Sequence, residues 1–210
     1  MIIAVDGTAA SGKGTLARRL AERLDLAYLD TGSLYRAVGL SLIHEGYAAS
    51  DVTAEIAAAA ASDLNTALMT DRALRSAETG QMASVVAAYP AVRAHLLDHQ
   101  RQFATTPPAS KAGAILDGRD IGTVVLPEAD AKFFVDAEMD IRVRRRHQEL
   151  MAEGSKLSLE DVKKQLEERD HRDKNRSHAP LIPAKDAIFV DTSEKNIEEM
   201  VAFALSALAG

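Results

Sequence analysis

The stretch GTAASGKGT, residues 7–15, has the residue types and spacing of a phosphate-binding loop. The pattern Gly-x-x-x-x-Gly-Lys is complete, and its glycines allow a tight turn in which successive backbone N–H groups converge on one anion. Lys13 is placed to reach the outer phosphates of a nucleotide as a point charge. The residues expected to hold these phosphates are Gly7, Thr8, Ala9, Ala10, Ser11, Gly12, Lys13, Gly14 and Thr15.

The residue after the lysine departs from the common form of this loop. Gly14 stands where Ser or Thr usually supplies a hydroxyl, and the hydroxyl is displaced by one position to Thr15. We therefore expect Mg²⁺ to accompany a bound nucleotide and to be held largely through water. An ordinary glycine-rich turn with a solvated lysine is the alternative. The apolar run before the loop and the helical pattern after it favour a phosphate loop.

Arginines indicate a second anion site. The formal net charge is −6, so the chain has no general attraction for a nucleic acid polymer, and an anion site must come from local clustering. Arg36, Arg93 and Arg119 lie beside strand ends or in mobile-looking segments, and residues 142–176, which begin with RVRRR, hold seven Arg and four Lys. The arginine fork binds phosphate oxygens bidentately. Any one of these arginines alone is better explained by a solvated helix face, and the charge pattern of residues 163–170 fits a surface helix equally well. The convergence of several arginines with a phosphate loop favours a second phosphate site.

The string DGRD places a cation and a carboxylate directly after a buried strand. We interpret Arg119 as a ligand of an acceptor phosphate and Asp120 as an acceptor for the amino group of a base. A turn with an internal Arg–Asp pair is the alternative. The chain has no Cys, and its six His lack metal-ligand spacing, so we expect no metal site built from protein ligands alone.

Short strands alternating with helices are predicted to position these residues. This alternation is typical of an α/β fold in three layers, with a parallel sheet of about five strands and helices on both faces. Ligands of such sheets bind beyond the carboxyl ends of the strands. The expected strands cover residues 2–5, 27–30, 114–117, 132–137 and 187–191, and the expected helices lie near 33–45, 138–153, 158–172 and 194–208.

We expect one domain over residues 1–210. Residues 46–110 interrupt the alternation and are interpreted as an inserted helical lobe, with a weak strand candidate at 64–69. The helix–loop–helix pattern of residues 141–176 predicts a lid that excludes water from the phosphates. The core then consists of residues 1–45, 111–140 and 177–210.

Composition excludes several classes of protein. The sequence has no uninterrupted apolar run of about 18 residues, so no membrane span is expected. The first residues, MIIAV, lack the basic start of a secretory signal, and the absence of Cys fits a reducing compartment. We therefore expect a cytoplasmic protein, and we expect a monomer.

In this order and spacing, GTAASGKGT, YLDTGSLYRA, ASVVAAYPAVR, DGRDIGTVVLPEA and ERDHRDKNRSHAPL resemble the bacterial-type cytidylate kinases. The resemblance covers almost the whole chain, and its weakest stretch is about 50–78. It implies the fold of the P-loop nucleoside monophosphate kinases, with a core, an insertion that binds the monophosphate and a lid. It also implies ATP-dependent phosphorylation of CMP and dCMP in pyrimidine metabolism.

The resemblance also implies roles for individual residues. Thr31, Arg36 and Arg119 match positions near the monophosphate, and Ser84, Arg93 and Asp120 match positions that recognise cytosine. Arg169 and Asp173 match positions at the sugar, and Arg176 matches a further arginine that contacts the substrate. Lys13, Arg119, Arg142 and Arg145 are the expected electrostatic catalysts.

This chain departs from the family pattern in three places. Thr8 replaces a usual Pro, and Ser33 replaces a usual Ala. Residues 62–75 are shorter than the strand-rich insertion commonly found there, which leaves the architecture of the lobe open.

Two other functions fit parts of the pattern. One is a different small-molecule kinase of this fold, acting on AMP, shikimate or gluconate. The other is a nucleotide-binding regulatory module such as a GTP switch, but the sequence lacks the Asn-Lys-x-Asp guanine signature. A switch also has no need of a second arginine-rich anion site.

Overall fold

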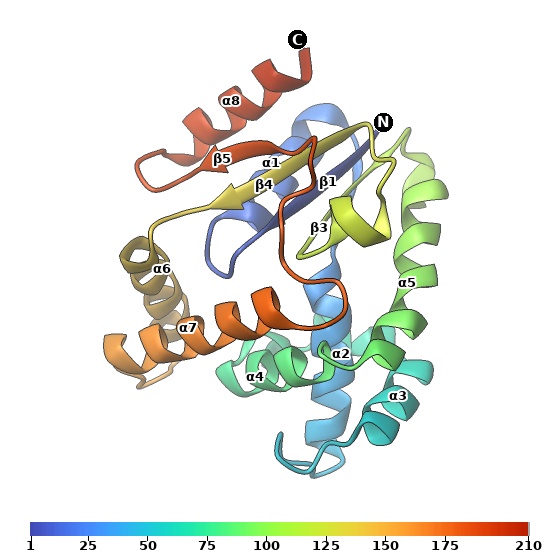
Figure 1. The fold of residues 1–210 in the computed structure, drawn as a ribbon, viewed down its shortest axis with the longest axis vertical. Helices are drawn as coiled ribbons and strands as arrows, with labels where there is room; N and C mark the ends of the chain where they lie inside the picture. Colours follow the sequence, from blue (N-terminus) through green and yellow to red (C-terminus); the bar gives the residue numbers. More distant parts are fainter. Residues whose placement is uncertain (210) are drawn as a thin grey trace.

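Five parallel strands form a sheet at the centre of the described residues, 1–209 of a computed structural model (Figure 1). Their order across the sheet is β2-β3-β1-β4-β5, so the strand that leads into the phosphate loop lies in the middle. All five strands predicted from the sequence are confirmed. Their bounds are β1 Ile2–Gly7, β2 Ala27–Asp30, β3 Ala114–Gly118, β4 Ala131–Asp136 and β5 Ile188–Asp191.

Helices cover the sheet and extend beyond it. The α-helices are α1 Lys13–Leu24, α2 Thr31–His44, α3 Ala54–Ser62, α4 Ala77–Val86, α5 Pro90–Thr105, α6 Met139–Ala152, α7 Leu159–Asn175 and α8 Ile197–Ala209. Short 3₁₀ turns occur at η1 Thr66–Thr70, η2 Arg72–Arg75 and η3 Pro108–Ser110, and a π-helical turn occurs at η4 Ile121–Val125. Within residues 1–209, no helix combines the length and the hydropathy of a membrane span.

Alternation along β1 builds two separate hydrophobic layers. Ile3 and Val5 pack with α1 and α8 on one face, whereas Ala4 packs with α2 and α5 on the other. Successive side chains of a strand point to opposite faces, so a central strand with both faces covered is apolar throughout. This explains why IIAV is a continuous apolar run, and it confirms the three-layer arrangement expected from the sequence.

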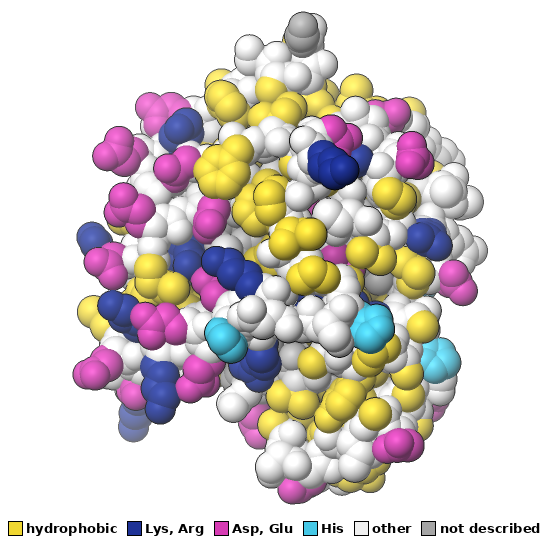
Figure 2. Space-filling model, viewed as in Figure 1, with side chains coloured by type: hydrophobic (Ala, Val, Ile, Leu, Met, Phe, Trp, Pro, Cys, Tyr) yellow, Lys and Arg dark blue, Asp and Glu magenta, His cyan; other side chains and the backbone are white. Residues whose placement is uncertain are grey.

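The site lies where the strands end and the remaining helices gather. In Figure 1, the pair α6–α7 lies at the lower left, and α2, α3 and α4 lie below the sheet. On the face shown in Figure 2, Lys and Arg side chains interspersed with Asp and Glu cover the side where α6 and α7 lie. The division into core, insertion (46–110) and lid (141–176) stays a prediction.

The strand expected at residues 64–69 is wrong. The segment forms η1 instead, because the Asn65 side chain accepts a hydrogen bond from the N–H of Ala67 at 3.1 Å and begins a turn. Asp71 does the same for Ala73 at the start of η2. Asn and Asp side chains compete in this way with regular backbone pairing. The shortened segment 62–75 is therefore built of two 3₁₀ turns.

Candidate active site

The loop between β1 and α1 has the backbone geometry of an anion cradle. Gly7 has a φ of 154°, and a Cβ there would lie 1.9 Å from the carbonyl oxygen of Val135, so no side chain fits. Gly12 has a φ of 89° and precedes α1 without a side chain that caps the helix. The first N–H groups of α1 are thus left for a ligand, and the positive end of the helix dipole lies beside them.

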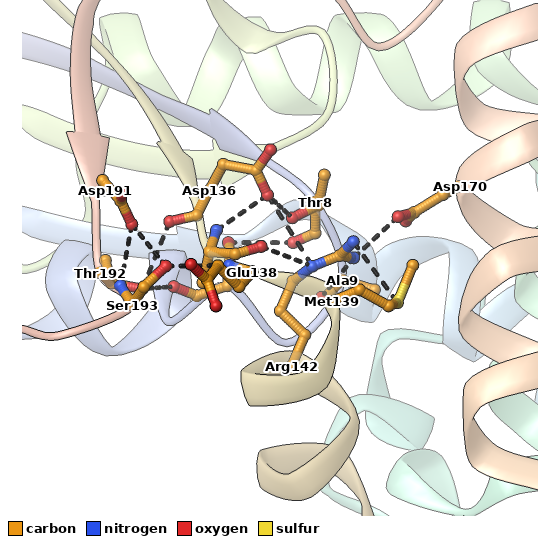
Figure 3. A network of polar contacts seen from close by, with 12 residues as sticks. Thr8, Ala9, Asp136, Glu138, Met139, Arg142, Asp170, Asp191, Thr192 and Ser193 are labelled. Carbon is orange, nitrogen blue, oxygen red and sulfur yellow. Dashed lines mark hydrogen bonds and ion pairs between the residues drawn. The ribbon is translucent and has the colours of Figure 1, made fainter. Parts of the chain in front are cut away.

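Side chains of β4 and α6, and Thr192 directly after β5, hold this loop in place (Figure 3). Thr8 donates to Asp136 Oδ1 at 2.6 Å, and Arg142 Nη1 donates to the Ala9 carbonyl at 3.4 Å while pairing with Asp170 Oδ2 at 2.8 Å. Thr8 therefore replaces the usual Pro with a hydrogen bond that ties the loop to the end of β4.

Arg145 supports the second half of the loop in a similar way. Its Nη1 donates to Thr192 Oγ1 at 2.9 Å, and Thr192 Oγ1 donates to the carbonyl of Ser11 at 2.7 Å. Arg142 and Arg145, both predicted to be catalytic, do not line the cavity described below. Their catalytic role stays a prediction, and their observed contacts fix the backbone of the phosphate loop.

Lys13 lies at the start of α1, with arginines and carboxylates around it. Burial, together with the positive charge of Arg119, lowers the pKa of Lys13 to about 8, although Asp117 and Asp30 oppose the shift. An anion beside Lys13 would relieve this repulsion and favour its charged form. The lysine is therefore placed to gain electrostatic energy when a phosphate binds.

The oxygens of two side chains lie beside Gly14. A Cβ at this position would be 3.6 Å from both Asp117 Oδ2 and the hydroxyl of Tyr28. Tyr28 donates to Asp117 Oδ1 at 2.8 Å, and Arg18 lies 5.4 Å from the centre of the Tyr28 ring. Burial and the nearby Asp30 raise the pKa of Asp117 to about 7, against the opposing effects of Lys13 and Tyr28. These oxygens lie where a Ser or Thr of the common loop would point.

A cavity of about 300 Å³ opens between the phosphate loop, the carboxyl ends of β2 and β3, and helices α4 to α7. All nine residues assigned to the acceptor from the sequence line it. They are Thr31, Arg36, Ser84, Arg93, Arg119, Asp120, Arg169, Asp173 and Arg176. The loop residues Ala9, Ala10, Gly12, Lys13, Gly14 and Thr15 line the same cavity, whereas Gly7, Thr8 and Ser11 do not.

Two buried carboxylates organise the arginines on the acceptor side. Asp120 forms a close ion pair with Arg93 and lies 3.8 Å from Arg176. Asp173 accepts from Arg119 Nε at 2.9 Å, and Arg169 Nε lies 3.9 Å away. A charge that is buried and unpaired is costly, so these carboxylates fix the orientations of the guanidinium groups.

Some polar groups that line the cavity lack a hydrogen-bond partner among the described residues. Ser84 Oγ and Arg169 Nε are buried without a hydrogen bond among the described residues. Burial and the nearby Arg119 lower the pKa of Arg169 to about 9, and burial and Arg146 lower the pKa of Arg36 to about 10. Crowded cations with unused donors form a site that is complementary to an anion.

The structure places in the cavity further residues that were not assigned to the site from the sequence. Arg146 of α6 lines the cavity, in contrast to the predicted lid arginines. Tyr28 and Asp117 also line it, beside Lys13. The RVRRR run marked α6 as basic, but the rotation of the helix decides which arginine faces the site. Asp117 was visible only as an Asp at the end of a strand.

The phosphate loop lies at the carboxyl edge of the central strand and faces a second cluster of arginines across one cavity. This arrangement defines a P-loop phosphotransferase of the nucleoside monophosphate kinase type. The family model described as cytidylate kinase matches residues 3–209. The chain belongs to the cytidylate kinase family.

Curated relatives agree over nearly the full length. A cytidylate kinase of Rhodospirillum rubrum is 54% identical over 209 residues, covering 100% of this chain and 97% of the relative. One of Paramagnetospirillum magneticum is 52% identical over 204 residues, covering 97% and 95% respectively. A solved structure of an uncharacterised Eubacterium ventriosum protein shares the fold at a TM-score of 0.56 with 12% identity, covering 100% of this chain and 99% of that one.

Proposed function

We propose that this protein transfers the γ-phosphoryl group of ATP to CMP and dCMP, giving ADP and CDP or dCDP. The observation that carries the proposal is the single cavity in which Lys13 and the phosphate loop face Arg36, Arg119 and Arg169. Donor and acceptor phosphates meet there between two sets of cations, and phosphoryl transfer depends mainly on such positioning and charge stabilisation.

On the donor side, residues 7–15 bind the phosphates of ATP through backbone N–H groups and Lys13. Within residues 1–209, no three His, Cys, Asp or Glu side chains gather as a metal site. Thr15 and Asp117 line the cavity, and two oxygen-bearing side chains suit a hydrated Mg²⁺ better than a bare one. When bound with ATP, the ion supplies charge neutralisation at the phosphates.

On the acceptor side, Thr31, Arg36 and Arg119 bind the phosphate of CMP. Ser84, Arg93 and Asp120 read cytosine, because a carboxylate accepts from the exocyclic amino group and a guanidinium donates to the ring acceptors. Arg169 and Asp173 bind the sugar, and Arg176 links the two sets through Asp120 and Asp173.

Catalysis is electrostatic. The acceptor phosphate is already an anion near neutral pH, so no strong general base is required. Lys13 and Arg119 hold the charge that develops during transfer, and Arg146 is the arginine of α6 that lines the cavity. The residues from 141 to 176 act as the lid and those from 46 to 110 as the acceptor lobe. We further propose that the protein acts as a monomer in the cytoplasm.

The test is a comparison of CMP, dCMP, UMP and AMP as acceptors with MgATP. We expect CMP and dCMP to be phosphorylated with kcat/KM values well above that for AMP. The proposal would be overturned by rapid phosphorylation of AMP without CMP activity. Tight nucleotide binding without any acceptor-dependent ADP formation would indicate a regulatory module instead.

A further inference from the structure

Asp6 connects the phosphate loop to the segment that carries the acceptor residues. It lies in β1 directly before Gly7, and the residue is 4% exposed. Oδ1 accepts from the N–H of Ile121 at 2.7 Å, and Oδ2 accepts from the N–H of Gly122 at 2.8 Å. These two amides follow Arg119 and Asp120 immediately in the chain.

The two amides have no capping side chain of their own. Asp120 precedes the π-helical turn η4 but makes no capping hydrogen bond to it. Its carboxylate is instead directed at Arg93 and Arg176. A buried N–H without an acceptor costs free energy, so η4 depends on Asp6 at its first two residues. The carboxylate of Asp120 is thereby left for the acceptor site.

The anchor is rigid because β1 is paired on both sides. Asp6 is opposite Gly118 of β3 and Phe134 of β4. Gly122 is also closely packed by its neighbours. A Cβ at Gly122 would lie 3.1 Å from Lys132 Cδ and 3.5 Å from Asp6 Oδ2. The segment from 118 to 122 is therefore held between the central strand and the side chain of Lys132.

We propose that Asp6 is a positioning residue that fixes Arg119 and Asp120 relative to the phosphate loop, so that the acceptor is held in line with the donor. The inference rests on the proposed CMP kinase activity. A misplacement of about 1 Å at a reacting group is enough to reduce transfer strongly.

Asp6→Asn tests the proposal with nearly unchanged shape. Asn keeps one acceptor oxygen but turns an NH₂ group towards the second N–H donor. We expect KM for CMP to rise about tenfold, the effect of one lost hydrogen bond to a charged group, and kcat to fall as well because the acceptor is no longer held in line, while the Kd for ATP alone changes less than about twofold. Hydrogen exchange at the amides of Ile121 and Gly122 should accelerate at least about tenfold.

Asp130→Asn is the matched control. Asp130 Oδ2 accepts from the N–H of Ile2 at 2.6 Å, so it anchors the amino end of the same strand, away from the cavity. We expect KM for CMP and exchange at Ile121 to stay within about twofold of the wild type. Equal behaviour of the two variants in KM for CMP would overturn the proposal, as would a loss of ATP affinity as large as the loss for CMP.

Gly122→Ala places a Cβ 3.1 Å from Lys132 Cδ, which should shift the backbone whose N–H donates to Asp6 Oδ2, and it leaves Asp6 in place. This variant tests the proposal if Asp6→Asn does not fold. We again expect KM for CMP to rise while the affinity for ATP is retained. An unchanged KM for CMP in a folded Gly122→Ala protein would count against the proposal. If the wild type does not phosphorylate CMP, the proposed function fails, whereas the exchange rates of the two amides still report whether Asp6 holds them.

Discussion

Arg119 Nε lies 2.9 Å from Asp173 Oδ2, a buried ion pair that joins the end of β3 to helix α7 across 54 positions of the sequence. Arg169 and Arg176 approach the same carboxylate at 3.9 Å. Three cations from the core and the α7 segment thus converge on a single anion. Asp173 is therefore the central residue of the part of the cavity that we propose binds the acceptor.

Asp173→Asn should reduce the free energy of unfolding by about 3 kcal/mol at pH 7, because it removes a buried counter-charge that three guanidinium groups share. Burial alone would raise the pKa of Asp173, but Arg119 and Arg169 hold it below the ordinary value of 3.8. The stabilisation is therefore present above pH 3.8 and is lost as the pH falls through the lower folded-state pKa.

Urea unfolding of the wild type and Asp173→Asn at pH 7, 5 and 3 measures this dependence. The difference should be unchanged between pH 7 and 5 and should shrink only near pH 3. Asp25→Asn, which removes an exposed partner of Lys111, is the control and should change stability by less than about 1 kcal/mol. A difference that disappears by pH 5 would show that Asp173 is not held ionised by the arginines.

Tyr28→Phe removes only the hydroxyl that donates to Asp117 and keeps the aromatic ring beside Arg18. Since this hydrogen bond lowers the pKa of Asp117, its loss should raise that pKa above about 7. We expect kcat with MgATP and CMP to fall about tenfold at pH 7, the scale of one hydrogen bond to a charged group. Tyr89→Phe also loses a hydroxyl hydrogen bond, to Val52 outside the cavity, and it should retain its kcat. Equal kcat values in the two variants would show that the Tyr28 hydroxyl does not contribute to catalysis.

Gly7 and Gly14 should respond differently to the addition of a methyl group. Gly7→Ala places a Cβ 1.9 Å from a backbone oxygen at a positive φ, so we expect severe destabilisation. Gly14→Ala meets only ordinary contacts at 3.6 Å within the first turn of α1, and it should keep or raise stability by up to about 1 kcal/mol. The Tm values of both variants, measured by thermal unfolding, test these two expectations. Severe destabilisation of Gly14→Ala would show that the space beside Asp117 is tighter than the structure indicates.

Arg146→Ala should reduce kcat at least about a hundredfold, because an arginine that neutralises the transferring phosphoryl group contributes at least this much. Arg144 on the same helix is exposed, and Arg144→Ala should change kcat less than about threefold. Steady-state kinetics with saturating CMP separates the two. If Arg142→Ala or Arg145→Ala is inactive at unchanged stability while Arg146→Ala is active, the catalytic arginine is one of those predicted from the sequence.

Much of the fold could be predicted because its signals are local. The apolar strands, such as Ile2–Gly7, and the glycines at 7 and 12 follow from periodicity and backbone geometry in a few consecutive residues. The acceptor residues were predicted through family resemblance, and all of them line one cavity. Their individual roles stay proposals.

The remaining features depend on contacts between distant segments. The rotation of α6 places Arg142 on Asp170 and leaves Arg146 at the cavity, and no spacing within RVRRR determines that rotation. The segment 64–69 has strand-like composition, but the Asn65 side chain starts a turn there. In the sequence, Asp6 is one of several Asp residues at strand ends. Its role follows only from the structure, in which the N–H groups of residues 121 and 122 donate to its carboxylate.

CMP-dependent ADP formation from MgATP, measured for the wild type and for Lys13→Ala, is the most direct test of the proposed CMP kinase activity. We expect turnover by the wild type that requires CMP, with a kcat of roughly 1–100 s⁻¹. We expect a kcat lower by orders of magnitude in Lys13→Ala, with the variant still folded. Near-normal turnover in Lys13→Ala, or ADP formation by the wild type that is indifferent to CMP, would show that the proposed activity or the role of Lys13 is wrong.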